Sequence, residues 1–133
     1  VKLKAFREYE IKDVNKVADM YNKAFSRTGL DNKLLLPRVK DGFLSSWAQY
    51  TVQLPKGVKR KDIQAKMKEK EIPTMVYYMK PMHKQGAFEA KNRVDTECVV
   101  TEELCGSVLS LPMHPYMTEE QVQEVVVTLA DII

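Results

Sequence analysis

The sequence predicts a small α+β domain in which helices pack on one face of a small three-stranded, mainly antiparallel sheet. Three observations lead to this fold class. Apolar residues recur at helical spacing near the start of the chain, an alternating run typical of a half-buried strand follows, and a capped helical pattern closes the sequence. Because the predicted strands are short, few and separated by helices, one helical layer over one sheet is the arrangement that buries the apolar faces of both.

Length and composition predict a single domain. A chain of 133 residues, 44% of them hydrophobic, can bury one core. Its 21 basic and 18 acidic side chains are interspersed, so the net charge of +3 favours a mixed solvated surface over one that binds polyanions. No apolar run reaches the roughly 20 residues of a membrane span, and no signal-peptide core follows Val1. We therefore expect a cytoplasmic chain with reduced cysteines and no membrane contact.

The first predicted element is an amphipathic helix from Lys2 to Ser26. Its apolar residues mostly recur at steps of three and four: Leu3, Phe6, Val14, Val17, Ala18, Tyr21, Ala24 and Phe25. Gly29 is placed to end this helix in a left-handed cap, and residues 34–37 then predict a short extended piece. The chain opens inside this helical pattern without an initiator Met, so we expect it to be part of a longer protein.

Residues 46–54 alternate as a half-buried strand does. Ala48, Tyr50, Val52 and Leu54 fall on one face, and Gln49, Thr51 and Gln53 fall on the other. A short basic helix is predicted from Lys61 to Glu71, with Ile63 and Met67 facing inward.

The remaining elements are two strands and two helices. The β-branched and aromatic residues of 74–78 predict the second strand, and residues 107–111 predict the third. Residues 99–105 predict a short helix. The clearest pattern is the capping box from Thr118 to Gln121, because apolar residues at helical spacing follow it as far as Ile132.

Common catalytic signatures are absent from the sequence, which has no GxGxxG, Walker, HExxH or GxSxG motif. Cys98 and Cys105 are too far apart for a redox pair and have no neighbouring histidines for a zinc site. The basic residues of 56–70 have no aromatic residue among them to stack nucleic-acid bases, so a solvated helix face is favoured there. His114 lies between two prolines, which favours a structural corner.

The segment from Tyr77 to Gln85 stands out, because a predicted strand ends there in a loop rich in polar and aromatic groups. His83 can hydrogen-bond a sugar hydroxyl or a phosphate oxygen, although a structural histidine is the alternative. Tyr77 and Tyr78 point to opposite faces if they lie in a strand, so one of them can present its hydroxyl to a cleft. Packing is the alternative role for each tyrosine.

Three segments of the chain resemble the DegT-type sugar aminotransferases, in that family's order and at its usual separations. The segments are 45–52 (SSWAQYTV), 70–85 (KEIPTMVYYMKPMHKQ) and 108–118 (VLSLPMHPYMT). The resemblance extends over essentially the whole chain. It departs from the commoner family pattern at Met79, where a proline is usual, and at Lys84, where an apolar residue is usual.

The resemblance implies the C-terminal small domain of a fold type I aminotransferase that depends on pyridoxal phosphate. Such an enzyme moves an amino group from glutamate to a nucleotide-linked keto-sugar, for example in cell-surface polysaccharide biosynthesis, and acts as a homodimer. A lysine of the large domain holds the cofactor as a Schiff base. Residues 1–28 would then be the linking helix from the missing large domain, and residues 45–133 the α+β core.

No catalytic, cofactor-binding or metal-binding residue is therefore expected in these 133 residues, and the isolated chain is expected to be inactive. The resemblance implies a substrate-binding role for Tyr77, Tyr78, Lys80, His83 and Gln85, against the nucleotide sugar. No nucleic-acid partner is expected. The alternative interpretation is an independent α+β module that binds a ligand or a nucleic acid.

Overall fold

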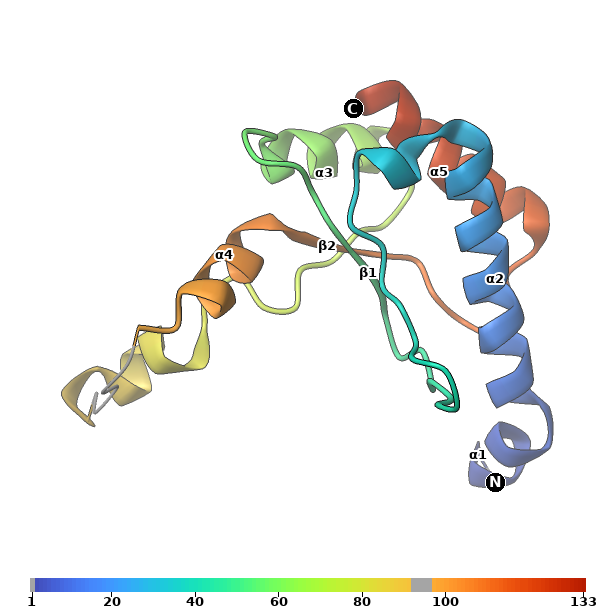
Figure 1. The fold of residues 1–133 in the computed structure, drawn as a ribbon, viewed down its shortest axis with the longest axis horizontal. Helices are drawn as coiled ribbons and strands as arrows, with labels where there is room; N and C mark the ends of the chain where they lie inside the picture. Colours follow the sequence, from blue (N-terminus) through green and yellow to red (C-terminus); the bar gives the residue numbers. More distant parts are fainter. Residues whose placement is uncertain (1, 92–96) are drawn as a thin grey trace.

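The computed structural model describes residues 2–91 and 97–133, and Figure 1 shows how their elements are arranged. The α-helices are α1 (Lys2–Ala5), α2 (Ile11–Thr28), α3 (Arg60–Glu69), α4 (Val99–Ser107) and α5 (Glu119–Ile132). The strands are β1 (Tyr50–Gln53) and β2 (Val108–Leu111). A π-helical turn, η1 (Phe6–Glu10), joins α1 to α2, and 3-10 turns lie at Leu30–Asn32, Met82–Lys84 and Gly86–Lys91.

The molecule has a helical body and a projecting arm. In the body, α3 and α5 lie toward one end of the two crossing strands, and α2 runs along one side of them (Figure 1). The arm consists of residues 77–91 and 97–107, and it carries α4 away from the body. Every residue of the main apolar core lies in the body, so the body is the part of the molecule that burial of apolar surface stabilises most.

The predicted opening helix is confirmed, with a π-helical turn within it. Gly29 ends α2 with a left-handed φ of 71°, and its N–H donates to the carbonyl groups of Phe25 and Ser26. Glycine adopts this conformation without the Cβ clash that other residues meet. One stripe of α2 is buried, as its spacing predicts: Val14, Val17, Ala18, Tyr21, Ala24 and Phe25. The left-handed cap predicted at Gly29 is therefore confirmed.

The two strands pair antiparallel, with Tyr50 opposite Leu111 and Val52 opposite Leu109. The predicted alternation is confirmed where β1 forms, because Tyr50 and Val52 are fully buried while Thr51 is half-buried. Side chains on the other face also pair, since the hydroxyls of Thr51 and Ser110 are 2.8 Å apart.

The α+β class is confirmed, but the described sheet has two strands where three were predicted. Residues 74–78 do not form the second strand, and only Met75 pairs, through two backbone hydrogen bonds with Ser110 of 3.0 and 2.8 Å. The chain then turns at Tyr77 and Tyr78, so the ladder cannot continue. The predicted extended piece at 34–37 contributes a similar single bridge, from Leu35 to Gln53.

The core forms where α2 packs against α5 beside the strands. The rings of Tyr21 and Tyr50 stack with their centroids 4.6 Å apart, and Phe25 stacks on both. Each buried phenol donates one hydrogen bond, Tyr21 to the carbonyl of Pro112 and Tyr50 to Asn22 Oδ1, both at 2.6 Å. Burial of these polar groups is therefore compensated.

The terminal helix, the basic helix and the short helix are also confirmed. The backbone N–H of Gln121 donates to Thr118 Oγ1 at 3.3 Å, and the backbone N–H of Thr118 donates to Gln121 Oε1 at 3.0 Å. In α3, Ile63 and Met67 are buried, as predicted. Among residues 2–91 and 97–133, no helix has the length and apolar character of a membrane span.

Candidate functional site

The loop at the base of the arm is shaped by its own backbone and one side-chain amide. Pro81 has an extended conformation and precedes the 3-10 turn at Met82–Lys84. The side-chain Nε2 of Gln85 donates to the carbonyl of Lys80 at 3.0 Å, which closes the loop across Pro81. The side-chain amide of Gln85, which was predicted to bind substrate, is thus hydrogen-bonded within its own loop.

A hollow of about 680 Å³ lies between this loop and α4. Four of the five residues predicted to bind substrate line it: Tyr77, Tyr78, Lys80 and Gln85. Pro81, Met82, Thr101, Leu104, Cys105 and Val108 complete the lining. The hollow therefore combines a mainly apolar wall with two phenols, one ammonium and one amide, the mixture that small-molecule sites typically present.

His83 does not line this hollow. Its Nε2 lies 3.1 Å from Oε1 of Glu102 on α4, and its side chain is 18% exposed. Lys84 approaches the other carboxylate oxygen, with Nζ 2.6 Å from Glu102 Oε2. Hydrogen bonds from Lys84 and from His83 hold the pKa of the Glu102 carboxyl below its usual value.

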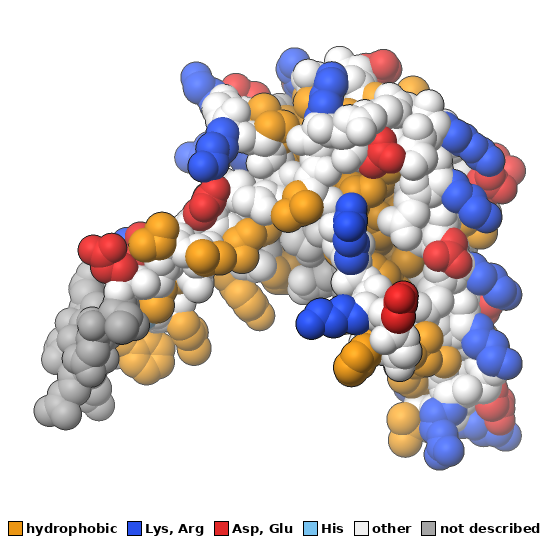
Figure 2. All heavy atoms as spheres, viewed as in Figure 1, with side chains coloured by type: hydrophobic (Ala, Val, Ile, Leu, Met, Phe, Trp, Pro, Cys, Tyr) orange, Lys and Arg blue, Asp and Glu red, His pale blue; other side chains and the backbone are white. Residues whose placement is uncertain are grey.

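Large apolar side chains are exposed along the arm. Figure 2 shows apolar side chains along the arm, while charged side chains cover the outer side of the body near α2. Tyr78 and Met79 are 72% and 73% exposed, and the remaining members of the group are Tyr77, Met82, Phe88, Val99, Val100 and Leu104. Large apolar side chains that are exposed in one part of a molecule typically mark a place where another protein surface or a ligand binds.

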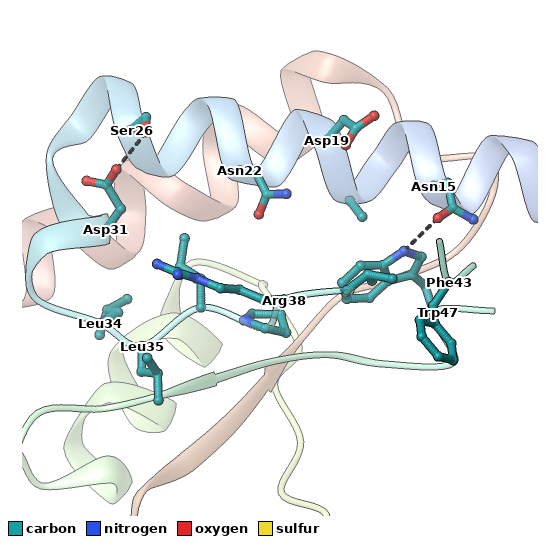
Figure 3. Close-up of a pocket in the computed structure, with 14 residues that line it drawn as sticks. Asn15, Asp19, Asn22, Ser26, Asp31, Leu34, Leu35, Arg38, Phe43 and Trp47 are labelled. Carbon is teal, nitrogen blue, oxygen red and sulfur yellow. Dashed lines mark hydrogen bonds between the residues drawn. The ribbon is translucent and has the colours of Figure 1, made fainter. Parts of the chain in front are cut away.

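A second hollow, of about 540 Å³, lies between α2 and the segment that precedes β1 (Figure 3). A polar stripe of α2 faces it: Asn15, Asp19, Asn22 and Ser26. Asn15 holds the opposite wall, because its Nδ2 donates to the carbonyl of Ser45 at 2.9 Å and its Oδ1 accepts from Trp47 Nε1 at 3.0 Å. Ser26 Oγ donates to Asp31 Oδ2 at 2.6 Å (Figure 3).

Arg38 extends into this second hollow below α2 (Figure 3). Within the part of the chain that the structure describes, the side chains of Arg38 and Asp19 make no hydrogen bond or ion pair, so both can contact a polar ligand or a neighbouring surface. Sequence reasoning missed both this hollow and Glu102. The polar stripe of α2 has the pattern of an ordinary solvated face, and Glu102 is 19 positions from His83 with no motif joining them.

The other residues to place are His114, the possible metal ligands and the lysines. His114 accepts the backbone N–H of Tyr116 at its Nδ1, 3.2 Å away, inside the turn before α5. Among the described residues, no group of three acidic, histidine or cysteine side chains is arranged to hold a metal ion. The lysines whose side chains are described are all exposed, so none has the desolvated surroundings that activate a lysine.

The sequence model of the DegT/DnrJ/EryC1/StrS aminotransferase family matches residues 1–130. The chain belongs to this family. The matched residues of this DegT-family chain include the arm, both strands and most of the terminal helix α5.

Curated relatives of this DegT-family chain include a UDP-2-acetamido-2-deoxy-3-oxo-D-glucuronate aminotransferase from Pseudomonas aeruginosa. It is 31% identical over 130 residues, which are 98% of this chain and 33% of the relative. A pleiotropic regulatory protein of Geobacillus stearothermophilus is 38% identical over 98 residues, which are 74% of this chain and 26% of that protein. The chain therefore spans about a third or less of the length of these relatives.

The solved structures show the same fold. A DegT/DnrJ/EryC1/StrS aminotransferase from Brucella abortus superimposes with a TM-score of 0.79 at 29% identity, covering 92% of this chain and 31% of that one. The aminotransferase TlmJ from Streptoalloteichus hindustanus has a TM-score of 0.81 over 98% of this chain and 33% of its own length, at 20% identity.

Proposed function

We propose that this chain is the C-terminal small domain of a longer, pyridoxal-phosphate-dependent aminotransferase that acts on a nucleotide-linked keto-sugar, with glutamate as amino donor. The observation that supports this is the family match over residues 1–130, in a chain that spans only 33% of a related UDP-sugar aminotransferase. The complete enzyme would act in the cytoplasm as a homodimer. The family match also disfavours the alternative of an independent binding module.

The cofactor would be held by residues outside this chain. Pyridoxal phosphate supplies the electron sink for moving an amino group, and it needs a lysine in a desolvated pocket. The lysines whose side chains are described are all exposed, so these residues do not fit that role. We accordingly propose no catalytic step for these lysines. We also propose that residues 1–28 are the linking helix from the large domain.

This chain would form one wall of the substrate cleft. The residues that line the hollow on the arm would make up that wall. Lys80 carries a positive charge beside the phenols of Tyr77 and Tyr78, and this combination suits a ligand with a diphosphate and a ring. Gln85, tied to the Lys80 carbonyl, would hold the loop in place beneath the ligand. The apolar wall would exclude water from the reacting sugar.

The test uses the longer protein together with this chain. The longer protein, given glutamate and a UDP-linked 3-keto sugar or a dTDP-linked 4-keto sugar, should release 2-oxoglutarate and the amino sugar. The 133-residue chain, incubated with pyridoxal phosphate and then reduced with borohydride, should carry no stoichiometric label on lysine. Stoichiometric labelling of one lysine in this chain, or no 2-oxoglutarate from the longer protein with either sugar, would contradict the proposal.

A further inference from the structure

We infer that Glu102 is a positioning residue for the substrate loop, because it holds the imidazole of His83 through Nε2 and the ammonium of Lys84 through Nζ. The effect of Glu102 on catalysis rests on the proposed function. Its effect on the position of His83 and of the loop concerns this chain alone.

The carboxylate of Glu102 joins two separate pieces of the arm. One oxygen lies 3.1 Å from His83 Nε2 and the other lies 2.6 Å from Lys84 Nζ. Within residues 2–91 and 97–133, these are the only hydrogen bonds or ion pairs that tie the segment 77–85 to α4. One side chain on α4 therefore provides the polar attachment of the loop.

The hydrogen bond to the Glu102 carboxylate determines which ring nitrogen of His83 carries a proton. A carboxylate only accepts hydrogen bonds, so Nε2 must carry a proton and donate it to Glu102. In the neutral ring, Nδ1 is then an acceptor, and in the charged ring it is a donor. His83 Nδ1 has no hydrogen-bond partner among the described residues. The same arrangement, a carboxylate that sets the orientation of an imidazole, is common around functional histidines.

The attachment also accounts for the departure of Lys84 from the usual apolar residue of the family pattern. Lys84 is half exposed, and its ammonium pairs with the carboxylate that holds His83. Two cationic or potentially cationic groups thus share one acceptor. Glu103, the next residue of α4, belongs to a different contact, because its carboxylate lies 3.5 Å from Lys56 of the body.

This difference provides a matched pair of variants, Glu102→Gln and Glu103→Gln, in the 133-residue chain. At one fixed pH, Glu102→Gln should move the ¹⁵N signal of His83 Nε2 and should speed amide exchange of residues 82–85 by about tenfold or more. Glu103→Gln should change neither. Circular dichroism should stay unchanged for both, because α4 buries none of its residues.

The longer enzyme supplies the second readout. If Glu102 positions the ligand-binding loop, Glu102→Gln should raise KM for the nucleotide sugar about tenfold and leave kcat within about twofold, as expected for lost uniform binding. A ¹⁵N signal and exchange rates that match the wild type in Glu102→Gln would overturn the inference. An unchanged KM would also overturn it. A wild-type enzyme without transaminase activity would instead overturn the proposed function, while the imidazole signal would still decide the role of Glu102.

Discussion

Asn15 shows how one polar side chain can fix a wall of a hollow. It donates to the carbonyls of Ile11 and Ser45 and accepts from the indole of Trp47, which itself has a left-handed φ of 45°. Non-glycine residues keep such a backbone conformation only where their surroundings hold it. This amide is therefore one of the contacts that hold the segment preceding β1, together with the stacking of Trp47 on Tyr50.

Replacing Asn15 with Ala should lower the free energy of unfolding by about 1–3 kcal/mol, because the partly buried indole N–H of Trp47 loses its acceptor. Urea unfolding followed by fluorescence measures this, since Trp47 is the only tryptophan. Asn32→Ala is the control, because the Asn32 amide is exposed and lies 3.5 Å from its acceptor. Equal losses in the two variants would argue against this role for Asn15.

Glu10 makes the stability of the body depend on pH. Its side chain is 3% exposed, and hydrogen bonds from Lys2 and then from Tyr116 hold its pKa below the ordinary value. The folded chain therefore binds fewer protons at this carboxyl than the unfolded chain does. The stabilisation is complete above the unfolded pKa of about 4.3 and is lost as the pH falls through the lower folded value.

The urea midpoint should accordingly fall between about pH 5 and about pH 3, and Glu10→Gln should make this fall shallower. Glu8→Gln should leave it unchanged, because Glu8 is exposed and, among the described residues, its only ion pair is a 3.8 Å contact with Lys4. An identical pH dependence in wild type and Glu10→Gln would show that Glu10 contributes nothing to it.

At the scale of single residues, the sequence predicted which side chains lie together where neighbours in the chain stay neighbours in space, and their role in binding substrate stays a prediction. Tyr77, Tyr78, Lys80 and Gln85 lie within one loop, and they line one hollow. Glu102 and Arg38 could not be predicted, because their positions depend on how distant segments fold together. The local pattern around each is that of a solvated residue.

Among the elements, α5 has the most clearly defined N-terminus, because a capping box precedes it. Replacing Thr118 with Ala removes the hydroxyl that accepts the N–H of Gln121, and it should cost about 1 kcal/mol of stability. Thr118→Ser keeps the hydroxyl and should lose much less. Thermal unfolding of the three proteins measures the difference, and equal melting temperatures for the Ala and Ser variants would show that the capping bond carries no stability.

The helices were predictable because their period and caps are local properties. The structure of residues 74–78 could not be predicted in the same way. Their β-branched and aromatic side chains indicate strand propensity, but they do not show whether a partner strand runs beside them. Here β2 meets only Met75 before the chain turns. Strand propensity therefore identified a residue at the sheet edge and overestimated the length of the pairing.

Across the whole molecule, stability is divided unevenly between the body and the arm. The helix α4 has no buried residue, whereas α2 and α5 supply much of the core. Amide exchange should therefore be faster in α4 than in α2 and α5, because opening the arm exposes little buried apolar surface. Mass spectrometry of exchanged peptides measures this, and equal protection of α4 and α5 would contradict the division.

The antiparallel pairing has a consequence for synthesis on the ribosome. Thr51 and Ser110 are 59 positions apart, so the sheet cannot form until most of the chain has been made. A nascent chain that has emerged as far as Leu111 carries both strands but still lacks Val122, Val126 and Leu129 of the core. Chaperones that shield apolar segments would therefore meet an open body until α5 emerges.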